Sequence, residues 1–292
     1  MTADPVPSLV DPDWLEPRLD EPDLRVLDCT VHLEFDPETG ARRTESGRPD
    51  WERSHVPGSA FADVPGDLSA ADPSYPYERP SPDRFADAME ALGVGDDSRV
   101  VCYDSAGNAW AARVWWLLRA FGFDDAGVLD GGWDRWIAEG RPVSTEPPTD
   151  REVTFTPEPR PELFVEREAV LEAIEDEGCR LVNALRPEDH AGTGLVKYGR
   201  PGRIPGSVNV PAVGEEAIVD PEDDTYLPRE ALRERFAEAG ATGSDRVITY
   251  CGGGIAASSA AFALHLLGVE DVAVYDGSLS EWGRTDLPME TG

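Results

Sequence analysis

The stretch RVITYCGGGIAASSAAFALHLLG, residues 246–268, contains the pattern from which the fold can be predicted. Its first part, residues 246–251, is a short run with several β-branched residues and indicates a buried strand. Three glycines follow, and then an apolar segment of helical length that ends at Gly268, a residue type that commonly terminates helices. A strand, a glycine-rich turn and a helix in this order are the building unit of an α/β fold with a parallel sheet.

The same order of elements occurs earlier in the chain. Residues 99–122 read RVVCYDSAGNAWAARVWWLLRAFG, which again predicts a strand, a turn that contains glycine, and a helix. Further strands and turns recur around both stretches, at residues 25–28, 55–60 and 126–131 in the first half and at residues 180–183, 203–208 and 272–277 in the second. A whole domain is therefore duplicated, because the period is too long for a solenoid repeat.

We predict an α/β fold of tandem domains, each a mainly parallel sheet flanked by helices. The first domain is expected to span residues 1–142 and the second residues 164–292. The segment between them, residues 143–163, holds prolines at positions 147, 148, 157, 159 and 161. Proline at this density produces a stiff, extended linker.

The net charge of -32 excludes several classes of partner. Nucleic acids and anionic membranes repel such a chain, so we expect neither as a partner. Lys197 is the only lysine, and an acidic chain with few lysines resembles the proteins of extreme halophiles, where molar salt screens charges beyond about 3 Å. Since no apolar run is long enough to span a membrane and no secretory signal is visible, we expect a cytoplasmic protein.

The chain has four cysteines, Cys29, Cys102, Cys179 and Cys251. None forms a CxxC pair and the four histidines do not cluster with them, so we expect neither a zinc site nor a disulfide framework. Three of the cysteines lie in or beside predicted strands and should be buried. Cys251 differs, because it lies at the carboxyl end of a parallel strand, where ligands bind in open α/β sheets.

The loop that begins at this cysteine reads Cys251-Gly252-Gly253-Gly254-Ile255-Ala256. Glycine permits positive φ, so several backbone N–H groups can point into one bowl, and the following helix adds its partial positive charge. Such a cradle holds an anion and stabilises a nucleophilic thiolate. Asp104 occupies the matching position in the first half, and a carboxylate cannot act as a sulfur nucleophile. We therefore predict one working site, in the second half.

These features resemble the two-domain rhodanese family, the thiosulfate and 3-mercaptopyruvate sulfurtransferases, over nearly the whole chain. The resemblance is carried by residues 55–58, 111–119, 128–133 and 203–209 and by the Cys251 loop. It implies that Cys251 takes the outer sulfur of a small-molecule donor as a persulfide and passes it to cyanide or a thiol. It also implies that no metal or organic cofactor is needed, and that the loop from Gly252 to Ala256 binds the substrate through its N–H groups.

The chain differs from the family pattern at the positions that bind the sulfur donor. Thiosulfate-preferring members tend to carry basic residues after the cysteine, and mercaptopyruvate-preferring members a glycine and then a serine, whereas this chain has Gly252 and Gly253. The substrate-binding arginine of the family aligns with Leu185, and Arg186 lies one residue later. We take Arg186 as the donor-binding candidate, thiosulfate as the expected donor and 3-mercaptopyruvate as the close alternative.

Other positions leave further alternatives open. The mercaptopyruvate subgroup uses an aspartate and a histidine of the first domain, and these positions hold Asp63 and Arg79 here. Lys197, Arg200 and Arg203 could supply positive charge near the donor. The displaced arginine suggests a second function, a persulfide carrier for which another protein is the sulfur donor or acceptor. A third function is a thiol-based phosphatase, but the short loop and its lack of arginine argue against it.

Overall fold

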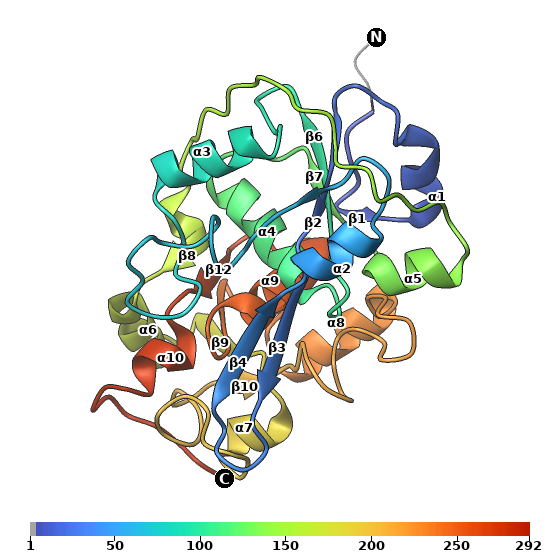
Figure 1. The fold of residues 1–292 in the computed structure, drawn as a ribbon. Helices are drawn as coiled ribbons and strands as arrows, with labels where there is room; N and C mark the ends of the chain where they lie inside the picture. The colour runs from blue at the N-terminus through green and yellow to red at the C-terminus, as the bar shows by residue number, and fades with distance from the viewer. Residues whose placement is uncertain (1–3) are drawn as a thin grey trace.

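The computed structural model describes residues 4–292 and contains two five-stranded sheets, one in each half of the chain (Figure 1). The first sheet has the order β1-β7-β6-β2-β5 and the second, read in the same direction, β8-β12-β11-β9-β10. All neighbouring strands in both sheets are parallel. The strands of the first sheet are β1 (Leu9–Val10), β2 (Leu24–Asp28), β5 (Ala60–Phe61), β6 (Arg99–Tyr103) and β7 (Ala126–Leu129). Those of the second are β8 (Phe164–Val165), β9 (Cys179–Asn183), β10 (Val208–Asn209), β11 (Arg246–Tyr250) and β12 (Val272–Tyr275).

Helices cover both sheets, as expected for parallel strands that are buried on both faces. The first half contains α1 (Pro12–Leu15), α2 (Arg48–Arg53), α3 (Pro82–Ala91), α4 (Ala109–Ala120) and α5 (Gly132–Ala138), with a 3₁₀ turn at Glu16–Arg18. The second half contains α6 (Arg167–Ile174), α7 (Pro187–Ala191), α8 (Arg229–Glu238), α9 (Ile255–Leu267) and α10 (Ser278–Trp282), preceded by a 3₁₀ turn at Pro161–Leu163. The predicted α/β fold with two parallel sheets is confirmed.

The repeat extends to individual contacts. The indole N–H of Trp136 donates to the carbonyl of Pro142 at 2.8 Å, and that of Trp282 to Pro288 at 2.9 Å. The strand predicted over residues 246–251 ends one residue earlier than expected, however, at Tyr250. The reason is that the backbone N–H of Cys251 donates to the Ser278 side chain instead of to a neighbouring strand.

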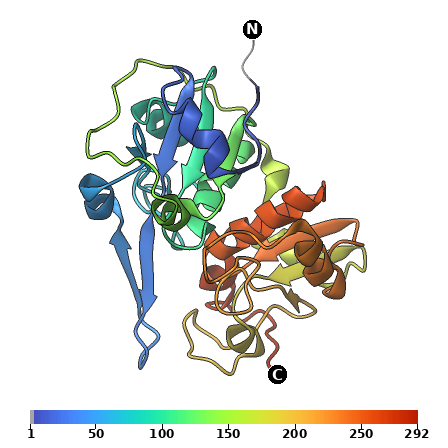
Figure 2. The same ribbon diagram turned by 90° about the vertical axis from the view of Figure 1, so that its right-hand side faces the viewer.

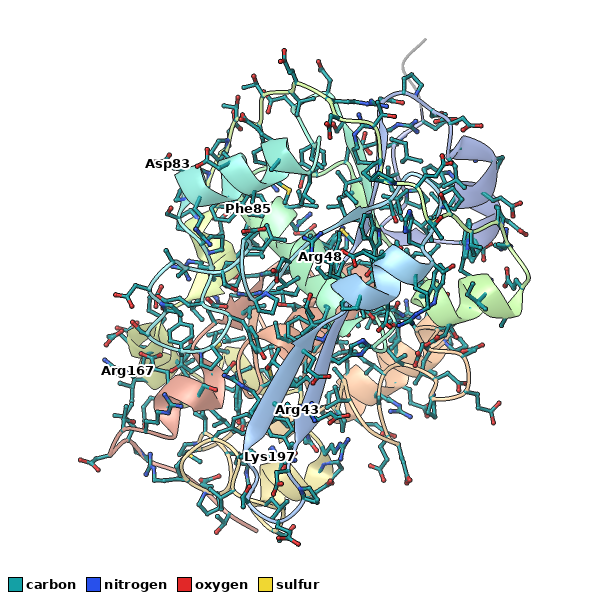
Figure 3. The ribbon with its side chains drawn as sticks, viewed as in Figure 1. Arg43, Arg48, Asp83, Phe85, Arg167 and Lys197 are labelled. Atoms are coloured by element: carbon teal, nitrogen blue, oxygen red, sulfur yellow. The ribbon has the colours of Figure 1, made fainter. Side chains whose placement is uncertain are left out.

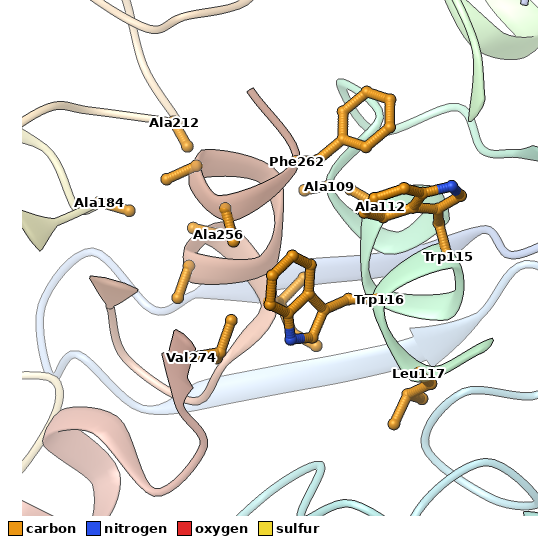
Figure 4. Packing of buried hydrophobic residues seen from close by; sticks show 14 of the residues in the cluster. Ala109, Ala112, Trp115, Trp116, Leu117, Ala184, Ala212, Ala256, Phe262 and Val274 are labelled. Atoms are coloured by element: carbon orange, nitrogen blue, oxygen red, sulfur yellow. The ribbon is translucent and has the colours of Figure 1, made fainter. Parts of the chain in front are cut away.

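Helices α4 and α9 join the two halves. The ring of Trp115 meets that of Phe262 edge to face, with centroids 4.8 Å apart, and both side chains are buried (Figure 4). Residues 255–264 of α9 are buried on all sides because the sheet and α4 cover them, which explains why this helix is apolar all round. Burial of each such large side chain stabilises the fold by roughly 1.5–3 kcal/mol. One hydrophobic cluster runs through both halves, and a second lies within the first half.

The segment between the two sheets is extended and lies along the first half. Phe155 is buried, and the backbone N–H groups of Glu158 and Arg160 donate to the carbonyls of Phe121 and Ala120. The chain then enters the second sheet at β8.

A β-hairpin that we did not predict projects from the first half towards the second (Figure 2). It consists of β3 (Val31–Phe35) and β4 (Arg42–Ser46), paired antiparallel. The ring of Phe35 meets that of Tyr198 edge to face, with centroids 5.8 Å apart, and Gly40 packs on the backbone of Val196. The hairpin therefore forms a wall between the two halves. Among residues 4–292, no helix is both long and apolar enough to cross a membrane.

Candidate active site

Cys251 lies directly after β11, at the bottom of a cleft between the two halves. The cleft has a volume of about 630 Å³, and only 2% of the cysteine surface is exposed. One wall comes from the first half, through the hairpin, Tyr77 and Trp110. The other comes from the second half, through residues 185–186, Leu195, residues 197–198 and the cysteine loop.

The loop after Cys251 offers backbone donors to this cleft. Gly254 has φ +83°, a left-handed conformation that glycine adopts without strain, and it caps the N-terminus of α9. Within residues 4–292, the N–H groups of Gly252, Gly253 and Gly254 donate to no protein acceptor. Free N–H groups beside a helix N-terminus form an anion-binding site. The six-residue loop that we predicted as substrate-binding is thus brought together around Cys251.

The first half shows what such a loop does with an anion. The Asp104 carboxylate accepts N–H groups from Ala106 at 2.7 Å, Asn108 at 3.0 Å and Ala111 at 2.7 Å. Burial raises the pKa of Asp104 to about 6, and the three N–H donors oppose this rise. The loop of the first half is therefore occupied by its own side chain, whereas the N–H groups beside Cys251 are free.

Ser278 holds the cysteine in place and was missed by the sequence analysis. Its Oγ accepts the backbone N–H of Cys251 at 3.1 Å and donates to the carbonyl of Tyr275 at 2.8 Å. Ser278 is fully buried and adopts φ +48°, which is unusual for a residue with a side chain. The equivalent residue of the first half, Gly132, has φ +50°. The replacement of a glycine by serine at this point of the repeat was the signal that could have revealed it.

Tyr198 determines what residue 252 can be. A Cβ atom at Gly252 would lie 2.3 Å from two ring carbons of Tyr198, closer than any real contact. Burial raises the pKa of the Tyr198 phenol, and the neighbouring Cys251 raises it further. The phenol therefore stays neutral beside the cysteine, and it fills the space in which a side chain at position 252 would lie.

A buried ion pair supports the loop from behind. Arg113 of α4 and Asp276, which follows β12, approach to 2.7 Å, and both side chains are almost fully buried. Arg113 also donates to the carbonyl of Tyr77 at 2.8 Å, and Asp276 accepts the N–H of Arg79 at 2.8 Å. Both side chains border Gly254. The pair thus links the first half to the base of the cysteine loop.

The structure brings Arg186 into the cleft. It is the N-terminal cap residue of α7, is exposed, and runs along Gly214. Leu185 also lines the cleft, but its side chain is buried. Of the two neighbouring positions, Arg186 and not Leu185 therefore presents a cation to the cleft.

The other predicted cations are largely engaged elsewhere. Lys197 lines the cleft, but its Nζ pairs with Asp189 at 2.9 Å. Arg200 donates to main-chain carbonyls, including that of Leu287 at 2.7 Å. Arg203 pairs with a carboxylate near the C-terminus at 3.6 Å. Arg200 and Arg203 therefore hold the C-terminal segment and do not line the cleft.

The two positions assigned to the mercaptopyruvate subgroup lie outside the cleft lining. The Asp63 carboxylate accepts the N–H of Gly66 at 3.1 Å and borders a separate depression. Arg79 pairs with Glu166 at 2.6 Å. Neither side chain contributes to the surface around Cys251.

The remaining cysteines are buried in the core. All four cysteines are free thiols, and burial raises the pKa of both Cys29 and Cys179. In the part of the chain that the structure describes, no group of three or more histidine, cysteine, aspartate or glutamate side chains is arranged to hold a metal ion.

Residues 4–292 form two α/β domains of one topology, with a cysteine on an open N–H cradle in one and a carboxylate that fills the cradle in the other, which defines a tandem-domain protein. The model of the rhodanese-like domain matches residues 11–139 and 166–285, and the chain belongs to the rhodanese family.

Relatives of the chain are sulfurtransferases. It is 34% identical to the thiosulfate sulfurtransferase of Rattus norvegicus over 299 residues, which cover 97% of this chain and 94% of the relative. It is 32% identical to the 3-mercaptopyruvate sulfurtransferase of Escherichia coli over 286 residues, 95% of this chain and 96% of the relative. It is also 32% identical to the mitochondrial thiosulfate/3-mercaptopyruvate sulfurtransferase 1 of Arabidopsis thaliana, over 99% of this chain and 79% of the relative.

Solved structures share the fold. The crystal structure of SseA from Escherichia coli, described as a 3-mercaptopyruvate sulfotransferase, matches with a TM-score of 0.79 and 27% identity over 93% of this chain and 98% of that one. An ergothioneine biosynthesis enzyme from Chlorobium limicola matches with a TM-score of 0.81 over 98% of this chain and 70% of that one. Its identity of 23% shows likeness of fold alone.

Proposed function

We propose that this chain is a sulfurtransferase that moves a sulfane sulfur from thiosulfate or 3-mercaptopyruvate to a thiophilic acceptor, such as cyanide or a thiol, through a persulfide on Cys251. Family membership and the relatives named for both donors support this function. The observation that carries it is the contrast between the two loops: free N–H groups surround Cys251, whereas Asp104 fills the matching cradle with its own carboxylate.

In the first half-reaction, the Cys251 thiolate attacks the outer sulfur of the donor. With thiosulfate, a sulfur–sulfur bond forms to Cys251, the bond to the inner sulfur breaks, and sulfite leaves with the electron pair. With 3-mercaptopyruvate, the carbon–sulfur bond breaks, and the carbon that loses sulfur takes up a proton to give pyruvate. The N–H groups of Gly252 to Ala256 stabilise the negative charge of the bound persulfide.

In the second half-reaction, the acceptor attacks the outer persulfide sulfur and the Cys251 thiolate is released. Cyanide becomes thiocyanate, and a thiolate becomes a persulfide. The neutral phenol of Tyr198 and the loop N–H groups need not change protonation in either step. Arg186 is our proposed donor-binding cation, supported by its place in the cleft.

We propose that residues 1–142 form a non-catalytic domain, residues 143–163 a linker and residues 164–292 the catalytic domain. Entry of the chain into the second sheet at Phe164 supports the last boundary. We also propose that the protein works in a reducing, salt-rich cytoplasm. Its four free cysteines and its net charge of -32 support this location.

The function is tested by mass spectrometry of the protein after incubation with thiosulfate or 3-mercaptopyruvate in concentrated salt. We expect the mass to increase by one sulfur atom, located on Cys251, and to return to its original value when cyanide is added. Cys251→Ser should abolish both changes, whereas the matched control Cys179→Ser, which alters a cysteine away from the cleft, should retain them. Failure of wild-type protein to gain sulfur from either donor would refute the proposal. The relatives do not favour the alternative of a persulfide carrier, and turnover of either free donor would exclude it.

A further inference from the structure

The hairpin β3–β4 places an arginine of the first half in the cleft of the second. In the antiparallel register, Arg42 lies opposite Phe35, so both side chains are on the same face of the hairpin. This face also carries Val31 and Leu33, and all four residues line the cleft around Cys251. Arg43, the next residue of β4, lies on the other face and pairs with Glu45.

Arg42 contacts Tyr77, which lines the same cleft as Cys251. Its guanidinium lies over the ring of Tyr77, with 5.1 Å between Cζ and the ring centroid, and the Tyr77 hydroxyl lies 2.8 Å from the hydroxyl of Thr44. On the other side, the positive charge of Arg42 opposes the rise in the pKa of Tyr198 that burial and Cys251 produce. Arg42 thus lies close enough for its charge to act on Tyr198, whose ring borders Gly252.

The charges of the cleft leave Arg42 without a partner. Three cationic residues line the cleft, Arg42, Arg186 and Lys197, together with two acidic residues, Glu34 and Asp189. Lys197 and Asp189 pair with each other at 2.9 Å, and Glu34 belongs to the face of the hairpin that carries Arg43, its partner in register (Figure 3 shows Arg43 and Lys197).

Across residues 4–292, no carboxylate oxygen lies within 4 Å of the guanidinium of Arg42 or of Arg186. The lack of an ion pair is not by itself distinctive, because other arginines, such as Arg48 and Arg84, also have none; the place of Arg42 and Arg186 in the lining of the cleft sets them apart. Two arginines that remain unpaired, and that both line the cleft of the nucleophile, are available to an anionic ligand.

We propose that Arg42 binds the anionic group of the sulfur donor, so that the first domain contributes a donor-binding residue to the site of the second. The inference rests on the proposed function, because it assumes that the donor is an anion attacked by Cys251. The guanidinium binds the sulfonate or carboxylate end of the donor from the hairpin wall, and Arg186 approaches from the opposite wall. The site is complete only when the hairpin lies against residues 196–198.

The experiment compares Arg42→Ala, Arg42→Lys and the matched control Arg43→Ala by steady-state kinetics with thiosulfate and with 3-mercaptopyruvate. We expect Arg42→Ala to raise KM for both donors about tenfold, the loss of about 1.4 kcal/mol of binding, and to change kcat less than twofold. Arg42→Lys keeps the charge and should recover most of the loss. Arg43→Ala should leave KM unchanged, because its side chain is on the outer face.

Two further measurements separate donor binding from a structural role of the hairpin. Because the contact is ionic, the ratio of KM between Arg42→Ala and wild type should fall as the salt concentration rises. Transfer of sulfur from preformed Cys251 persulfide to 2-mercaptoethanol, an uncharged thiol, should occur at the wild-type rate. A wild-type KM in Arg42→Ala, or an equal increase in Arg43→Ala, overturns the inference while persulfide formation upholds the function. No persulfide on wild-type Cys251 overturns both.

Discussion

Two substitutions of Ser278, whose backbone is left-handed, are expected to lower stability by different amounts while both lower activity. Ser278 combines a strained backbone, φ +48°, with a hydroxyl that accepts the Cys251 N–H and donates to Tyr275. Ser278→Ala removes both hydrogen bonds and keeps the strain, whereas Ser278→Gly removes both bonds and relieves the strain. The two variants therefore separate the contribution of the side chain from that of the backbone.

The magnitudes follow from burial. Loss of the hydroxyl leaves the buried N–H of Cys251 without an acceptor, which costs about 1–3 kcal/mol. The left-handed conformation costs a residue with a Cβ atom about 1–2 kcal/mol, and glycine avoids this cost. Glycine also makes the unfolded chain more flexible, which lowers the stability of the folded protein by up to about 1 kcal/mol. We therefore expect Ser278→Ala to lose about 2 kcal/mol and Ser278→Gly about 1 kcal/mol.

Thermal unfolding and kinetics check these values. At about 2–4 °C per kcal/mol for a domain of this size, the midpoint Tm should fall by about 4–8 °C for Ser278→Ala and by about half as much for Ser278→Gly. Both variants release the Cys251 backbone, so kcat should fall by at least about tenfold in each. Ser244→Ala, which removes a hydroxyl far from the loop, is the control. A Tm for the glycine variant equal to or below that of the alanine variant, or wild-type kcat in both, would refute the reasoning.

The loops and the ion pair give three more predictions. Gly252→Ala places its methyl group 2.3 Å from a phenol ring and should lower kcat/KM at least about tenfold, whereas Gly253→Ala, whose nearest neighbour lies at 3.4 Å, should keep it within about threefold; steady-state kinetics decides. Burial raises the pKa of Asp104 from 3.8 to about 6, so the stability that its proton adds is present below about pH 3.8 and lost as the pH rises through 6. The stability of Asp104→Asn relative to wild type should therefore rise by up to about 3 kcal/mol from pH 4 to pH 7 in denaturant titrations; a constant difference contradicts this. Arg113→Met leaves a buried carboxylate unpaired and should cost about 3–5 kcal/mol, most of which Arg113→Met/Asp276→Asn should recover in the same titrations; a double variant no more stable than the single one argues against the pair.

The sheets and the position of Cys251 could be predicted because their signals are local and occur twice. Strands β6 and β11 are short apolar runs, and glycines stop the helices that follow them. Because the halves share one order of elements, the residue that follows each of these strands could be matched, and Asp104 was identified as the equivalent of Cys251. The free and filled N–H cradles agree with this match.

The hairpin and the residues around the loop could not be predicted in the same way. The hairpin has a local signal, the alternation of Val31, Leu33 and Phe35 before a turn, but the second half contains no copy of it to support the assignment. Ser278 and Arg113 contact the loop from 27 and more than 100 residues away in the chain, and such contacts depend on how the halves pack.

The cations show why charge alone does not locate a site. Arg186, Arg200 and Arg203 are close in sequence, yet only the first lines the cleft. The end of β9 and the start of α7 turn it there, whereas the other two bind carbonyl or carboxylate groups near the C-terminus.

After duplication, the two copies came to differ in what their matching loops hold: Asp104 fills the loop of the first half with its own carboxylate. A loop whose N–H groups already hold the Asp104 carboxylate keeps its shape with no substrate present. Other parts of the first half contact the second half instead: the hairpin lines the cleft around Cys251, and the buried Arg113 pairs with Asp276. The first copy thus contributes to the surroundings of Cys251 as a partner chain does in a dimer, at an effective concentration that dilution cannot lower.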